Sequence, residues 1–273
     1  MMLPIILFTV IIAFLFVKRN TKQEYFIKPK YGILLFVLFC VITVPRVVAQ
    51  NKKVATNNDL WFTLHGDHKI NNKFGIESEL HFRRTDWGAQ SQQFLFRPSV
   101  YYGINDFLSV YLGYTHIQTY PYGDQPIAFQ TPENNALIQS VVKQSISKFN
   151  ISHRYRYESR WIGNVSLLNG KEQVDGYTHR NRFRYRVTVS YPIQDTKFSI
   201  KSFDEIWLNF GNNVANNGFD QNWFYLGVDY KILKFAQLGV GYMHQHINKP
   251  NGVQQEKNNT IQVTLSYKIP FKK

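Results

Sequence analysis

The chain has 273 residues, of which 44% are hydrophobic and 18% charged, and its formal net charge is +14. This length suits one large domain, and the single cysteine, Cys40, excludes an intramolecular disulfide framework. A strongly basic chain can meet anionic lipid or nucleic acid, but the export signal described next argues against nucleic acid.

The first 49 residues are expected to be absent from the mature protein. A basic stretch at 28–30 is followed by an apolar region at 32–44 and by the small-residue sequence Val47-Val48-Ala49. This order is typical of a cleavable secretory signal peptide. The earlier apolar run, residues 1–17, has two interpretations. It is either a helix of the minimum length for a membrane span or sequence upstream of the true start, and we favour the second. Beyond residue 49 the net charge is +9.

Eleven later segments are predicted to be β-strands from their period-two alternation or β-rich composition. In 150–161 and 178–191, arginines alternate with aromatic and β-branched side chains, so each strand has one charged and one apolar face. No window after residue 50 approaches 18 uninterrupted apolar residues, so a membrane-spanning form must be a closed barrel. The predicted strands are 60–69, 74–84, 92–102, 108–118, 137–147, 151–161, 178–191, 198–210, 221–230, 235–246 and 260–271.

The connections between these segments alternate short and long, as in an up-and-down outer-membrane barrel with short periplasmic turns. Bacterial single-chain barrels have even strand numbers. With eleven strands, the first strand would begin on the side of the long loops. We therefore expect an all-β transmembrane barrel of about 12 strands, with 10 as the alternative and a missed strand in 50–58 or 119–136. The expected organisation is a removed segment at 1–49, a short segment at 50–58 and a barrel at 59–273.

Four stretches carry a family resemblance: DLWFTLHGDHKINNKFGIESELHFRR from Asp59, HRYRYESRW, FRYRV and the closing IQVTLSYKIPF. They resemble the uncharacterised outer-membrane barrels grouped as domain of unknown function 2490. The resemblance extends from Asp59 to Phe271 and implies the outer membrane of a Gram-negative bacterium, without implying a reaction or a ligand. The last strand, with Tyr267, Ile269 and Phe271 at period two, also resembles the signal that the outer-membrane insertion machinery recognises.

The charged faces predict a cluster inside the barrel. A narrow lumen cannot leave many charges unpaired, so a structural ion-pair network is the plainest interpretation. Because arginine is in excess, the sharper hypothesis is a lumen that selects small anionic solutes. The expected lumen charge cluster is Glu77, Glu79, Arg83, Arg97, Arg154, Arg156, Glu158, Arg160, Arg182, Arg184, Arg186, Glu205 and Asp229.

The predicted function is a narrow passive pore or a structural membrane protein in contact with outer-membrane lipid and lipopolysaccharide. A barrel-embedded lipid-active hydrolase or acyltransferase is the first alternative, and it needs a nucleophile held by a base near the outer rim. Histidines are expected there, but none carries a His-Ser sequence pattern. His244 and His246 share a face without an evident third ligand, so neither a metal nor another cofactor is expected. A soluble periplasmic β-protein is the third possibility.

Overall fold

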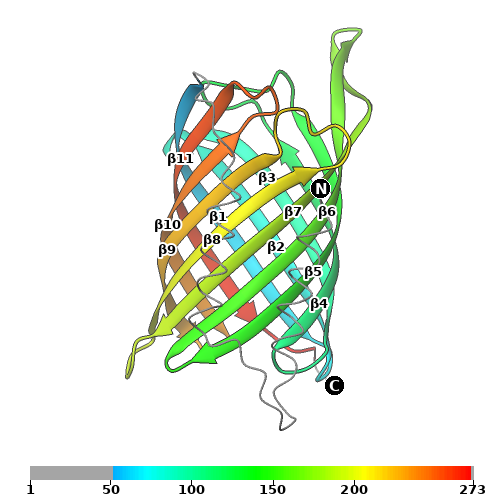
Figure 1. The fold of residues 1–273 in the computed structure, drawn as a ribbon. Helices are drawn as coiled ribbons and strands as arrows, with labels where there is room; N and C mark the ends of the chain where they lie inside the picture. The colour runs from blue at the N-terminus through cyan, green and yellow to red at the C-terminus, as the bar shows by residue number, and fades with distance from the viewer. Residues whose placement is uncertain (1–51, 272–273) are drawn as a thin grey trace, which may run out of the picture. The chain divides into compact units, whose positions relative to one another are not determined.

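The structure, a computed structural model, describes residues 52–271, and there the chain forms a closed β-barrel of eleven strands (Figure 1). The predicted signal peptide lies outside these residues. Within them, no helix is long and apolar enough to cross a membrane. The strands are β1 (Lys53–Lys69), β2 (Phe74–Thr85), β3 (Gln90–Gly103), β4 (Leu108–Thr119), β5 (Thr131–Ile146), β6 (Phe149–Leu168), β7 (Lys171–Pro192), β8 (Phe198–Phe210), β9 (Phe219–Leu233), β10 (Ala236–Asn248) and β11 (Gln254–Lys268), with one 3₁₀ turn, η1 (Asp86–Gly88).

Every consecutive pair of strands is antiparallel, and the barrel closes where β1 pairs with β11 in parallel. Trp61 lies opposite Gln262 in that closure. Beyond β11, the backbone N–H groups of Ile269 and Phe271 still donate to the carbonyls of Asp67 and Lys69. The parallel closure follows from the odd strand number, and it places the start of β1 and the end of β11 at opposite ends of the barrel.

The all-β barrel prediction is confirmed, and the eleven described strands correspond to the eleven alternating segments. The even-number rule had suggested about 12. The two places expected to hide a further strand instead lengthen existing ones: β1 begins at Lys53 rather than at Leu60, and β5 begins at Thr131 rather than at Leu137. The segment 53–58 is therefore part of the barrel wall.

The two faces of the wall have opposite chemistry. Among the described residues, 28 buried ones are polar or charged and 10 are hydrophobic, the reverse of a water-soluble core. Large apolar side chains such as Phe82, Leu112, Leu226 and Val240 are exposed on the outside. The predicted orientation, with apolar side chains outward and arginines inward, is confirmed.

The two ends of the barrel also differ. The β1–β2, β3–β4 and β5–β6 connections are tight turns. Hydrogen bonds close them, such as the one that the N–H of Phe74 donates to Asn71 Oδ1 at 2.8 Å. At the other end, β6 and β7 continue as a hairpin that rises beyond the rim (Figure 1). We call these the short-turn end and the long-loop end.

Candidate functional site: the barrel lumen

A network of arginines and glutamates crosses the lumen between β2, β3 and β6–β8. Glu158 accepts hydrogen bonds from Arg182 at 2.6 Å and Arg184 at 2.9 Å. Glu205 is fully buried and accepts from Arg184 at 2.9 Å and Arg186 at 2.5 Å, and it also pairs with Arg154. These contacts form because neighbouring antiparallel strands place residues of the same parity on one face, at adjoining heights.

The third carboxylate of the network is Glu79 on β2. It pairs with Arg97 at 2.8 Å and, across the lumen, with Arg156 at 3.9 Å. Arg156 also lies 3.7 Å from Glu158. Three glutamates and Asp220, which lies 3.4 Å from Arg182, thus serve six arginines, so the belt carries excess positive charge. The six arginines are Arg97, Arg154, Arg156, Arg182, Arg184 and Arg186.

Other residues of the predicted cluster have separate partners. Glu77 lies 3.5 Å from His65, Asp229 lies 2.7 Å from Lys201, and Arg160 makes two hydrogen bonds to Glu133 at 2.7 and 2.8 Å. The partners His65, Lys201 and Glu133 were not among the predicted lumen residues. Glu133 was assigned to a long loop, whereas it lies in β5 and faces Arg160. Lys201 and Glu205 are four residues apart in the same strand, so their side chains face the same side. This spacing could have placed Lys201 in the lumen.

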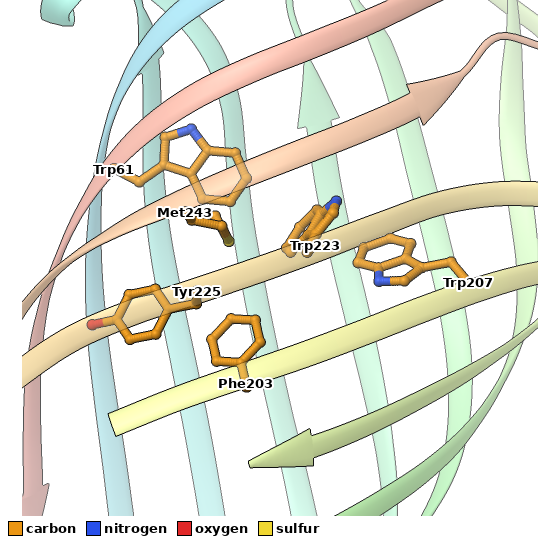
Figure 2. Packing of buried hydrophobic residues seen from close by; sticks show 6 residues of the cluster. All are labelled: Trp61, Phe203, Trp207, Trp223, Tyr225 and Met243. Carbon is orange, nitrogen blue, oxygen red and sulfur yellow. The ribbon is translucent and has the colours of Figure 1, made fainter. Parts of the chain in front are cut away.

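An aromatic cluster lines the wall beside the ion pairs, and the sequence analysis did not predict it (Figure 2). The rings of Phe203 and Tyr225 stack at 4.9 Å with an interplanar angle of 8°. Trp61 meets Trp223 edge to face at 5.4 Å. In the sequence, Trp223 and Tyr225 stood out only as aromatic residues on the otherwise polar face of the strand predicted at 221–230. The cluster consists of Trp61, Phe203, Trp207, Trp223, Tyr225 and Met243.

The aromatic cluster and the arginines contact one another. The guanidinium of Arg184 lies 3.6 Å from the ring centre of Trp207, and that of Arg186 lies 3.9 Å from the centre of Phe203. Such cation–π contacts contribute more where water is excluded. They help to fix these arginines against the wall.

Arg83 differs from the arginines of the network. Its side chain is buried, with the residue 8% exposed, and it forms no ion pair within the part of the chain that the structure describes. The guanidinium lies 4.0 Å from the ring centre of Trp61 and 5.5 Å from that of Trp223. Its Nη1 donates to Gln93 at 2.6 Å, while its buried Nε has no hydrogen-bond partner.

Two cavities occupy the lumen, of about 250 Å³ towards the short-turn end and about 170 Å³ towards the long-loop end. They meet at a level where Arg83, Arg97, Arg184 and two tryptophans line both. The level between the cavities is therefore bordered by cationic and aromatic side chains.

The segment between β4 and β5 folds into the long-loop end and helps to line the smaller cavity. Tyr122 Oη donates to Glu256 at 3.0 Å, and Gln125 Nε2 donates to the carbonyl of Lys53 at 2.9 Å. Burial and the neighbouring Glu256 carboxylate raise the pKa of the Tyr122 phenol well above its usual value. Tyr122 therefore keeps its proton and holds this segment to the start of the barrel wall.

On the outer face, near the long-loop end, Ser159 Oγ lies 2.7 Å from His179 Nε2. The two residues are on neighbouring strands, and the ring of Trp161 lies 5.3 Å from that of His179. Sequence spacing could not reveal this pair, because twenty residues separate its members. His244 and His246 lie at the same end of β10, and residues 52–271 contain no group of three or more side chains suited to hold a metal.

A closed barrel with an apolar exterior and a polar, charged interior is the architecture of outer-membrane β-barrels, and this chain is such a barrel. The chain belongs to the family described as "Protein of unknown function (DUF2490)", whose family model matches residues 58–256.

Solved structures of two porins and of OmpT are similar to this chain at low sequence identity. The NanC porin is 14% identical, with 77% of this chain and 99% of that chain covered and a TM-score of 0.47. The KdgM porin is 13% identical, with 68% and 89% covered and a TM-score of 0.38. Outer-membrane-expressed OmpT of Vibrio cholerae is 16% identical, with 67% and 56% covered and a TM-score of 0.35. No match is found among curated proteins.

Proposed function

We propose that this protein is a narrow passive pore of the bacterial outer membrane that favours small anions. The observation that carries the proposal is the excess of arginine in the belt around the two cavities, where three glutamates and Asp220 serve six arginines. Rings of arginine and lysine select anions because their positive potential is strongest in a confined, poorly screened space. The long-loop end is expected to face the cell exterior.

The arrangement also explains how the lumen stays folded. The paired arginines are held by carboxylates and aromatic faces, so they provide a fixed positive potential rather than mobile side chains. Lys201 lines the larger cavity, whereas its partner Asp229 does not, so Lys201 places a cationic donor towards the short-turn end. An anion entering from either end meets cationic donors before it reaches the level of Arg83.

Planar-bilayer recordings of the purified, folded barrel test the proposal. We expect discrete conductance steps and, across a KCl gradient, a reversal potential of the sign that chloride preference gives. The Lys201→Gln variant should reduce the anion preference, whereas Lys171→Gln, on the hairpin outside the barrel, should not. Absence of conductance from correctly folded protein, or cation preference, would contradict the pore.

A second candidate function is ester hydrolysis of outer-leaflet lipid, favoured by the contact between Ser159 and His179. In this reaction Ser159 Oγ attacks the ester carbonyl carbon while His179 Nε2 takes the serine proton and then gives it to the departing alcohol. Water hydrolyses the resulting acyl-serine, with the same histidine as base, and releases the fatty acid. Within residues 52–271, no carboxylate orients the other ring nitrogen of His179, so we expect a slow enzyme.

A serine-reactive fluorophosphonate separates this candidate from the pore. Hydrolysis predicts labelling that is lost in Ser159→Ala and retained in Ser166→Ala, which removes a hydroxyl from the exposed part of the same strand. The same variants should abolish or retain fatty-acid release from phospholipid micelles. Labelling that survives Ser159→Ala would rule out this site.

A further inference from the structure

Within residues 52–271, the charge of Arg83 has no ion-pair partner. A buried guanidinium without an anionic partner is unfavourable by several kcal/mol, and buried charges in proteins are therefore normally paired. The network carboxylates are already shared among other arginines, and Glu79, the nearest on the same strand, is engaged by Arg97 and His81 at 2.8 Å each. The Nε of Arg83 remains unpartnered where the two cavities meet.

The surroundings of Arg83 also specify a shape. One face of its guanidinium packs on Trp61 and its Nη1 donates to Gln93, which leaves the N–H edge at Nε, and such an edge suits the two oxygens of a carboxylate. The larger cavity beside it is walled by Trp61, Phe203, Trp223 and Tyr225 (Figure 2). Its volume of about 250 Å³ is below the ~300–1,000 Å³ of sites for drug-sized ligands, which favours a single-ring solute.

Two glycines keep this aromatic wall flat. A Cβ added at Gly241 would lie 2.5 Å from Cζ of Tyr225, and one at Gly227 would meet the same phenol ring. Because both positions lack a side chain, Tyr225 lies along the wall and stacks on Phe203 instead of filling the cavity. The cavity therefore retains a planar apolar face next to the unpaired guanidinium.

We propose that the lumen contains a binding site for a small planar monocarboxylate, whose carboxylate pairs with Arg83 and whose ring packs against Trp61, Trp223 and Tyr225. The proposal deepens the proposed function in that it rests on anions entering the lumen and names the class that is bound there. Pairing supplies Arg83 with its missing counter-charge, and the apolar ring displaces water from the aromatic wall.

Calorimetric titration of the full, detergent-solubilised barrel with benzoate tests the site. We expect benzoate to bind at least about tenfold more tightly than benzamide, which has the same shape without the charge, and than acetate, which lacks the ring. Equal binding of benzamide would overturn the role of Arg83, and equal binding of acetate would overturn the role of the aromatic wall. Failure of folded wild-type protein to bind benzoate would overturn the whole proposal.

Variants at two adjacent positions locate the site. Arg83→Gln should weaken benzoate binding at least about tenfold. Arg84→Gln should leave it within about twofold, because Arg84 instead donates to the carbonyls of Gly88 and Ala89 at the rim. Equal binding by both variants would overturn the assignment. If Arg83→Gln does not fold, Arg83→Lys, which keeps the charge but loses the planar fork, should still show weakened binding.

The titration and the bilayer recordings test the binding site and the pore independently. Conductance without benzoate binding would remove the site and leave the pore intact. Arg83-dependent benzoate binding without conductance would remove the pore and leave a lumen binding site.

Discussion

Two parts of the lumen use arginine in opposite ways. On β6–β8, arginines such as Arg184 are held by two carboxylates and an aromatic face, and their burial is compensated. On β2, Arg83 is also buried, but its partners among residues 52–271 are an amide oxygen and aromatic rings. The comparison shows that residue type does not determine the role of a lumen charge. The number of carboxylates within reach decides whether an arginine stabilises the barrel or remains available for a solute.

The largest expected effect is loss of the shared carboxylate in the paired part. Glu205→Gln leaves Arg154, Arg184 and Arg186 with reduced compensation, and breaking buried pairs in this way costs about 3–5 kcal/mol. Urea unfolding in lipid vesicles, followed by tryptophan fluorescence, measures the free energy of unfolding. The control is Glu172→Gln, on the exposed hairpin, with a change near zero. Equal stability of both variants would show that the network does not stabilise the barrel.

A smaller loss is expected from a charge placed on the outer wall. Leu226 is 51% exposed near the middle of β9, so Leu226→Arg should reduce the free energy of folding into a bilayer by about 2–4 kcal/mol. Ile232→Arg, nearer the short-turn end of the same strand, should cost about 0–1 kcal/mol. Equal costs at the two positions would argue that this wall does not contact the hydrocarbon core.

The smallest effect is expected at the unpaired arginine. In Arg83→Gln the lost stacking on Trp61 is offset by removal of an uncompensated buried charge, so the free energy of unfolding should stay within about 1 kcal/mol of wild type. The same urea titration measures it, beside Glu205→Gln. A loss as large as that of Glu205→Gln would place Arg83 among the structural arginines and remove the contrast between the two parts.

The strands and their faces could be predicted because period-two alternation is a local property. Arg154 and Arg184 were assigned to the lumen from their apolar neighbours alone, and the apolar rows proved to face outward. The heights at which residues meet could not be predicted. The contact of Ser159 with His179 and the reach of Glu79 to Arg156 depend on strand register and on distance across the lumen, which alternation does not encode.

The aromatic wall was missed for a related reason. Trp207 and Trp223 lie on the polar faces of their strands, where a sequence pattern cannot distinguish an inward ring from a break in the alternation. Their rings are 4.4 Å apart only because β8 and β9 pair in the observed register. The unpaired state of Arg83 likewise depends on where all the carboxylates lie.

By itself, the sequence determined an all-β chain with apolar rows for lipid, an arginine-rich interior and one end of short turns, because each of these follows from neighbouring residues. The tertiary structure decided the parallel closure of β1 on β11, the sharing of four carboxylates among six arginines and the position of Arg83 at the level where the linings of the two cavities overlap. The reason is that charge pairing acts through space: Arg154 and Glu205 come together across 51 residues of chain when β6, β7 and β8 pair, and Glu79 reaches Arg156 across the lumen only when the sheet curves into a barrel.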